Sequence, residues 1–184
     1  MTGKVLVLDV DETLLTMEPV FYLERFHKAF RRVSGIHVTF AGREYYLERR
    51  PFALSFLEKV RQHFALVAWS LAESHVTKQK LQLVGLDSCF VCVLGKHDLV
   101  DGKKSVVRLA ERLHIEANNI FAVDDRPELY DAHERVIRIA PWSISDTNDS
   151  ELLKVLELIE QKTGEVMLSK AKVVETVAIR NALS

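Results

Sequence analysis

The stretch VLVLDVDETLL, residues 5–15, decides the fold of this chain. Its first part, Val5–Leu8, is a short apolar run with β-branched residues, which is typical of a strand buried on both faces. Two carboxylates, Asp9 and Asp11, follow that run directly. A buried strand seldom ends in two carboxylates unless they are solvated, paired or bound to metal. Because ligands bind at the carboxyl ends of parallel strands, the stretch predicts a binding site here.

Similar apolar runs recur along the chain and alternate with helical patterns. The runs predict strands at Phe64–Trp69, Phe90–Leu94, Ile120–Val123 and Val136–Ile139. Apolar residues at three- and four-residue spacing predict helices at Pro51–His63, Glu73–Val84, Lys103–His114 and Asp149–Lys162. This alternation predicts an α/β fold, a Rossmann-like parallel sheet with helices on both faces.

Two segments after the first strand break the alternation. Pro19–Val33 has the pattern of an amphipathic helix, with Phe26, Ala29, Phe30 and Val33 on one stripe. Ile36–Phe40 and Tyr45–Glu48, joined by AGRE, predict a β-hairpin. We therefore expect a small helix and hairpin insertion in a single domain over residues 1–184, with a core of about 3–162 and a helical tail at 163–184.

Composition excludes several classes of protein. The chain has 184 residues, 48% hydrophobic, and a formal net charge of -1, which predicts no nucleic-acid partner and no membrane. No apolar run approaches the roughly 20 residues that span a bilayer. Asp9, Asp11 and Glu12 interrupt the apolar N-terminal segment, so it does not resemble a signal peptide. A cytoplasmic location is the expectation, with the nucleus or delivery into another cell as alternatives, and the oligomeric state stays open.

The two cysteines, Cys89 and Cys92, are spaced as C-x-x-C. In a strand this spacing places the two sulfurs on opposite faces, and the sequence has no second cysteine pair or neighbouring histidine pair. We expect buried, unreactive thiols and no zinc site.

Other predicted strands end in residues that match the carboxylates of the first. Ser70 follows FALVAW, and Asp124 and Asp125 follow IFAV. Lys103 and Lys104 open the helix before that last strand. Hard oxygen ligands suit Mg²⁺, and a hydroxyl and an ammonium suit phosphate oxygens. An aspartate nucleophile would need the metal to offset its repulsion by a phosphate dianion.

These motifs, taken in order, resemble the haloacid dehalogenase (HAD) superfamily. More narrowly, the chain resembles FCP/SCP-type phosphatases, which are C-terminal-domain phosphatase-like and NLI-interacting-factor-like. The resemblance covers roughly residues 3–162 and rests on LDVDETLL, YYLERRPFALSFLEKVRQHFALVAWS, KSVVRLAERL, AVDDRPELY and PWSISDTNDSELLKVLELIE. It implies an essentially capless HAD-like core and a Mg²⁺-dependent phosphoric monoester hydrolase.

The resemblance also implies roles for individual residues. Asp9 would be the nucleophile that becomes an aspartyl-phosphate. Asp11 would protonate the leaving group and then activate water, and its backbone carbonyl would bind the metal. Thr13 would brace the loop. Ser70 would donate a hydrogen bond to a phosphate oxygen, while Lys104 would neutralise phosphate and nucleophile.

The remaining implied roles concern the metal and the substrate. Asp125 would contact Mg²⁺, with Asp124 beside it holding the metal and the lysine, and Asp9 and Asp11 completing the metal set. Arg126 joins Ser70 and Lys104 in substrate binding. Lys103 is the fallback for the catalytic lysine.

The open site predicted here favours a phosphorylated protein or peptide as the substrate, carrying phospho-Ser/Thr or phospho-Tyr. One alternative is a small-molecule phosphatase in which Pro19–Val33 forms a partial lid, and another is a catalytically idle binding module. We also predict a positive rim beside the site, formed by Arg25, Lys28, Arg31, Arg32, Arg43, Arg49 and Arg50.

Overall fold

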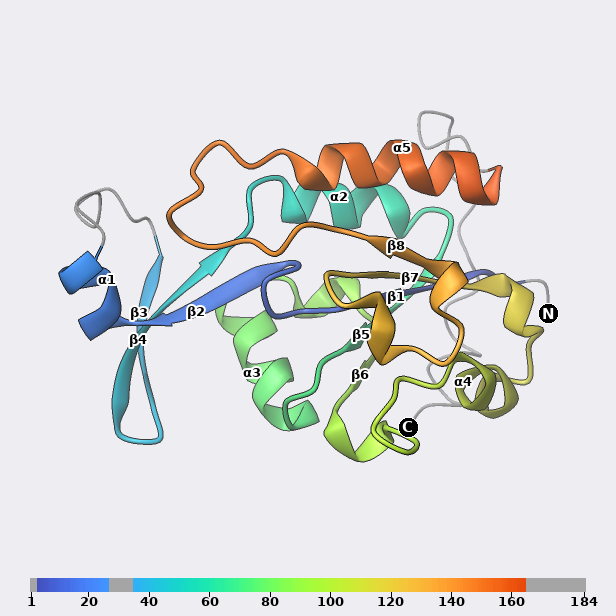
Figure 1. Cartoon of the computed structure of the whole chain (residues 1–184), viewed down its shortest axis with the longest axis horizontal. Helices are drawn as coiled ribbons and strands as arrows, with labels where there is room; N and C mark the ends of the chain where they lie inside the picture. The colour runs from blue at the N-terminus through green and yellow to red at the C-terminus, as the bar shows by residue number, and fades with distance from the viewer. Residues whose placement is uncertain (1–2, 27–34, 165–184) are drawn as a thin grey trace.

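The run Val5–Leu8 forms β1, the middle strand of a five-stranded parallel sheet, in a computed structural model that describes residues 3–26 and 35–164, apart from the side chains of Glu24 and Phe26. The sheet order is β6-β5-β1-β7-β8 (Figure 1). The other strands of this sheet are β5 (Ala65–Trp69), β6 (Cys92–Leu94), β7 (Ile120–Asp124) and β8 (Val136–Arg138). Both neighbours of β1 pair in parallel, so the α/β class is confirmed.

Side chains of β1 alternate between two cores, as a strand buried on both faces requires. Leu6 and Leu8 pack with the apolar sides of α2 (Ala53–Val60) and α5 (Glu151–Thr163). Val5 and Val7 pack with α4 (Val106–Leu113) on the opposite face. Helix α3 (Ser74–Leu83) lies beside β6. Helices therefore cover both faces, as predicted. The short 3-10 helices are Asp87–Cys89, Lys96–Asp98, Ala117–Asn119, Pro127–Leu129 and His133–Arg135.

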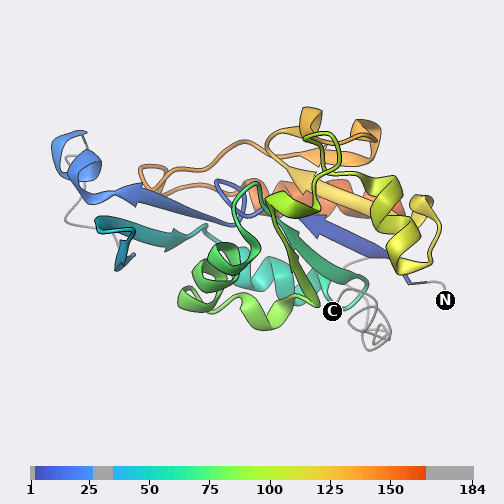
Figure 2. The same ribbon diagram turned by 90° about the horizontal axis from the view of Figure 1, so that it is seen from below.

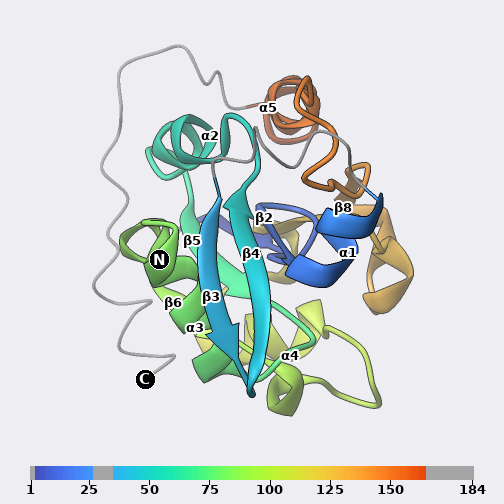
Figure 3. The ribbon, with the colours of Figure 1, turned by 90° about the vertical axis from the view of Figure 1, so that its left-hand side faces the viewer.

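A second, three-stranded antiparallel sheet follows β1 and contains the predicted hairpin. Its order is β2-β4-β3, with β2 at Leu15–Pro19, β3 at Ile36–Phe40 and β4 at Arg43–Arg49. Figures 1 and 2 show this sheet and α1 (Val20–Phe26) extending beyond the end of the main sheet, and Figure 3 shows its strands in front of the main sheet. The hairpin turn is only Ala41-Gly42, both at positive φ, which matches the twist of paired strands.

Several predicted boundaries were wrong. Pro19 ends strand β2, which was not predicted because LTMEP has a weak strand pattern; Pro19 is tolerated at the end of an edge strand. The helix after it begins at Val20, and its predicted continuation over residues 27–33 lies outside the described residues, as does the tail from 165.

The predicted strand Phe90–Leu94 and the helix at Lys103 also begin later than expected. Strand β6 starts at Cys92, and Cys89 lies in a 3-10 turn. The two thiols are nevertheless free and pack on opposite faces of the sheet, Cys89 buried and Cys92 half-buried. Helix α4 starts only at Val106, because Ser105 caps its N-terminus by accepting a hydrogen bond from the Arg108 amide at 3.2 Å.

Candidate active site

A tight turn at the end of β1 places the first two carboxylates at the edge of the main sheet. The Asp9 amide donates to the Val123 carbonyl at 3.0 Å, which continues the pairing of β1 with β7. The chain then reverses, with the amides of Leu14 and Leu15 donating to the Val10 carbonyl. Glu12, at φ 62, absorbs the reversal. The side chains of Asp9 and Asp11 therefore project from the same tight turn.

Lys104 is the buried cation at the centre of the site. Its Nζ lies 2.7 Å from Asp9 Oδ1 and 2.6 Å from Asp124 Oδ2, and the side chain is fully buried. The Lys104 amide donates to the Leu129 carbonyl at 2.8 Å, and the ammonium lies 5.3 Å from the centre of the Tyr130 ring. Lys103 is exposed. This backbone bridge joins the segment before α4 to the segment after β7. It therefore turns the side chain of Lys104, and not that of Lys103, into the site.

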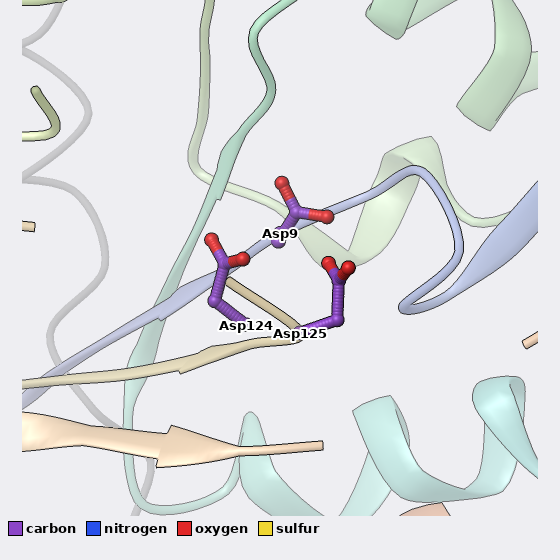
Figure 4. A group of neighbouring side chains, drawn as sticks. All are labelled: Asp9, Asp124 and Asp125. Carbon is purple, nitrogen blue, oxygen red and sulfur yellow. The ribbon is translucent and has the colours of Figure 1, made fainter. Parts of the chain in front are cut away.

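Three carboxylates gather at the ends of β1 and β7. Oxygens of Asp9, Asp124 and Asp125 lie within 4.8 Å of one another, and Figure 4 shows their side chains converging. Both oxygens of Asp124 are engaged, since Oδ1 accepts from the Arg126 amide at 2.8 Å and Oδ2 from Lys104. In contrast, Asp9 Oδ2 and Asp125 Oδ1 are buried and have no hydrogen-bond partner among the described residues. Buried, unpaired carboxylate oxygens in a cluster fit a hard divalent cation.

The same crowding perturbs the protonation of these groups. Burial raises the pKa of Asp9 to about 7, a shift that Lys104 opposes and Asp124 reinforces. Burial, followed by the charge of Asp124, also raises the pKa of Asp125. One lysine therefore does not fully compensate the negative charge at this end of the sheet.

Asp11 does not belong to the three-carboxylate cluster and is held by other side chains. Its Oδ2 accepts a hydrogen bond from Ser70 Oγ at 2.9 Å, and its Oδ1 forms an ion pair with Lys80 of α3. Ser70 is buried, and its Oγ also accepts from the Ala72 amide at 3.0 Å. Ser70 does not cap α3, because Glu73 precedes the first residue of that helix. Asp9 and Asp11 are thus held by different lysines.

Arg50 stabilises the loop that carries both aspartates. Its guanidinium pairs with Asp149 through two hydrogen bonds of 2.8 and 2.6 Å and reaches the carbonyls of Glu12 and Thr13, each at 3.3 Å. Thr13 is buried, yet its hydroxyl has no hydrogen-bond partner within the described part of the chain. Thr13 therefore contributes to the loop through its main-chain carbonyl, which accepts a hydrogen bond from Arg50, and not through its hydroxyl.

Two side chains that contact the loop of Asp9 and Asp11 were missed by sequence reasoning. Lys80 falls between Thr77 and Leu81 on the buried stripe of α3, so a lysine at an apolar position was the available signal. Arg50 was assigned to the positive rim, which is wrong because it is buried and paired with a residue 99 positions away. No local pattern indicates such a pair.

Arg126, which the resemblance assigned to substrate binding, has a half-exposed side chain beside Asp125, with Nε 3.9 Å from Oδ2. The remaining residues of the predicted rim are only partly placed, and Arg43 is exposed at the start of β4. Arg49 donates to the Val84 carbonyl at 3.3 Å, and Arg25 lies over the Phe21 ring. Lys28, Arg31 and Arg32 lie outside the described residues.

The site geometry agrees with the family comparison. Residues 4–169 match the family model described as NLI interacting factor-like phosphatase. The chain belongs to this family. Family membership confirms the resemblance seen in the motifs around Asp9 and Asp125.

Curated relatives in the family are longer than this chain. It is 28% identical over 168 residues to CTD small phosphatase-like protein 1 of Caenorhabditis elegans, covering 88% of this chain and 32% of the relative. It is 30% identical over 165 residues to nuclear envelope morphology protein 1 of Schizosaccharomyces pombe, covering 85% and 32%. The chain thus spans about a third of the length of these two relatives.

Solved structures share the fold. Fcp1, described as an essential RNA polymerase II CTD phosphatase, aligns with a TM-score of 0.56 at 17% identity, covering 100% of this chain and 58% of that one. A predicted phosphoglycolate phosphatase from Haemophilus somnus 129PT aligns with a TM-score of 0.57 at 13% identity, covering 86% and 98%. Proteins named for a macromolecular and a small substrate match equally well, so the fold does not select the substrate. Within the described residues, no helix has both the length and the apolar character to cross a membrane.

Proposed function

We propose that this chain is a Mg²⁺-dependent phosphatase that hydrolyses phosphoprotein monoesters through an aspartyl-phosphate at Asp9. The observation that carries the proposal is the Asp9 carboxylate, which is buried at a strand end with one oxygen on Lys104 and the other unpaired. An oxygen of Asp9 attacks phosphorus while the bond to the leaving oxygen breaks, and Asp11, which must be in its protonated form for this step, donates its proton to that oxygen.

The second half of the reaction uses the same residues. Asp11 accepts a proton from a water molecule that attacks the phosphorus, and the bond to Asp9 breaks to release inorganic phosphate. The Ser70 hydroxyl, which donates to Asp11 before substrate binds, turns its single proton to a phosphate oxygen when the phosphoryl group is present. Lys104 offsets negative charge on Asp9 and on the phosphoryl group, and the half-exposed Arg126 contacts the substrate at the rim.

The residues present fit a magnesium ion. Asp9 and Asp125 offer unpaired buried oxygens, and Asp124 completes the cluster. The main-chain carbonyl of Asp11, which the family resemblance implies as a ligand, would add a further oxygen. When bound, Mg²⁺ would offset the repulsion between the phosphate dianion and the carboxylates.

A protein substrate is supported by the surface next to the site. A small open pocket with a cavity volume of about 20 Å³ lies between the small sheet and α3, lined mainly by apolar side chains: Met17, Val38, Thr39, Phe40, Leu47, Val76, Gln79, Lys80 and Leu83. Lys80 belongs both to this lining and to the ion pair with Asp11, so the pocket lies beside the reacting groups. A phosphopeptide can lay a small apolar neighbour of its phosphorylated residue against this lining, although the pocket is too small to enclose a large side chain.

The test is turnover by the purified chain on a panel with Mg²⁺. The panel holds an aryl phosphate, matched phospho-Ser, phospho-Thr and phospho-Tyr peptides with or without apolar flanking residues, and sugar phosphates. We expect phosphopeptides with an apolar flank to be preferred and chelator to abolish turnover. Asp9→Asn should lower turnover by more than about 1,000-fold, whereas the exposed Asp101→Asn should not.

Two outcomes of that panel contradict the proposal in different ways. Preference for sugar phosphates would replace the protein substrate by a small molecule, and no turnover of any phosphate would indicate a binding module. Val38→Asp, which places a charge in the pocket, should lower kcat/KM for the apolar-flanked peptide about tenfold and leave the aryl phosphate unchanged.

A further inference from the structure

Lys80 is a buried lysine in the interior of a helix. It lies near the end of α3 with an exposed fraction of 6%, on the same face as the buried Thr77 and Leu81. Its aliphatic stem lines the apolar pocket beside the site. Burial of an ammonium group is unfavourable unless a partner compensates its charge, and here that partner is Asp11.

The contacts of Asp11 fix its side chain from one side. Ser70 Oγ donates to Oδ2 at 2.9 Å, and Lys80 donates to Oδ1. Both donors belong to the segment that runs from the end of β5 through α3. The Asp11 side chain remains 37% exposed, so without such contacts it could adopt several rotamers.

Each aspartate of the turn is therefore paired with its own lysine. Lys104 holds Asp9 within the three-carboxylate cluster, and Lys80 holds Asp11 outside it, toward the pocket. An unrestrained Asp11 could instead turn toward solvent. Its proton transfer requires it to stay within hydrogen-bond reach of the leaving oxygen.

We propose that Lys80 is a positioning residue that holds the Asp11 carboxylate on the substrate side of the site. This inference rests on the proposed function, because it assigns Lys80 to the proton-transfer step that Asp11 performs. Lys80 acts through Asp11 and contacts neither the phosphoryl group nor the nucleophile. Its loss should slow the chemical steps and leave substrate affinity nearly unchanged.

The experiment compares Lys80→Met with Lys80→Arg, Asp11→Asn and the double variant Lys80→Met/Asp11→Asn. Lys78→Met is the matched control, since Lys78 is exposed on the same helix. Phosphoenzyme formation is measured in single turnovers, with p-nitrophenyl phosphate as the good leaving group and an alkyl phosphoserine peptide as the poor one. Melting temperature is measured for every variant, which identifies any that fails to fold.

We expect Lys80→Met to slow phosphoenzyme formation on the phosphoserine peptide by about 10- to 100-fold, with KM changed less than about threefold. The loss should be smaller on p-nitrophenyl phosphate, because that leaving group needs less proton donation. Lys80→Arg, which keeps the charge and hydrogen bonding, should recover most of the rate. The double variant should be no slower than Asp11→Asn alone, since Lys80 then has no acid to position.

Other results overturn the inference. Additive losses in the double variant, a raised KM with unchanged rate, or equal losses on both leaving groups would assign Lys80 to substrate binding or to stability. Failure of the proposed function looks different, because the wild-type chain itself would then show no phosphatase chemistry to compare. A full-rate Lys80→Met beside a slow Asp11→Asn would leave the phosphatase proposal intact and remove only Lys80.

Discussion

The main sheet and the small sheet bury their residues in different ways. The central strand β1 is covered on both faces and ends in the carboxylates of the site. In the small sheet, one side packs against the segment after β8 through a cluster of Leu23, Trp142 and Ile144, with Tyr46 against it. The other side faces α3 across an open, largely apolar pocket. The main sheet therefore positions reacting groups, whereas the small sheet forms a wall beside them.

The contacts of the small sheet argue for a fixed wall. The Trp142 amide donates to the Glu12 carbonyl at 2.8 Å, and the Ile144 amide donates to Glu18 at 3.2 Å. The fully buried Leu23 joins α1 to the same segment. A segment packed in this way is poorly suited to open and close as a lid, so the described part of α1 does not support the partial-lid alternative.

The largest stability effect should come from the main sheet. Lys104→Met leaves Asp9 and Asp124 buried without their shared cation, so the free energy of unfolding should fall by about 3–5 kcal/mol. Urea denaturation measures it, and Lys103→Met, at an exposed neighbour, should change stability by less than about 0.5 kcal/mol. Equal stability of the two variants would mean that the site charges do not depend on Lys104.

A smaller effect is expected when the wall is loosened. Leu23→Ala opens a cavity beside Trp142 and Ile144 and should cost about 2–4 kcal/mol. Hydrogen exchange should show lost protection in β2 and β4 but not in β1, and turnover of an aryl phosphate should hardly change. Phe21→Ala, 66% exposed on the same helix, is the control. Loss of protection in β1 would show that the two sheets unfold as one unit.

The last effect is a slope, small per pH unit, and concerns Asp9 before metal binds. Its pKa is raised from 3.8 to about 7, chiefly by burial, so the folded chain holds this proton more tightly than the unfolded chain. The resulting stability is complete below the unfolded pKa and is lost as pH rises through about 7, with a slope of at most about 1.4 kcal/mol per pH unit. Asp9→Asn should flatten this decline in chelator. An identical slope in wild type and variant would place the titration elsewhere.

Much of the fold followed from local pattern. Val5–Leu8 is a strand as predicted, and Ala65–Trp69 and Ile120–Asp124 differ from their predictions by one residue at one end. Continuous apolar runs are easily read because strands buried on both faces have no polar alternation. The strand β2 was missed because its residues LTMEP become a strand only through pairing with β4.

The candidate site divides in the same way. Asp9, Ser70, Asp124 and Asp125 follow apolar strands, and parallel strands bring their carboxyl ends to one edge, so sequence alone could group them. The choice between Lys103 and Lys104 could not be made locally. It depends on a bridge between Lys104 and Tyr130, which turns one of two adjacent side chains inward.

The sequence by itself determined the α/β class, the strand ends that carry carboxylates and the motifs of the family, because these are properties of neighbouring residues. Only the tertiary structure decided that Asp11 pairs with Lys80 and that Arg50 pairs with Asp149. Such partners are brought together by the packing of elements far apart in the chain. The partner of a buried charge is the side chain that lies next to it after folding. The spacing of neighbouring residues in the sequence does not indicate which side chain that is.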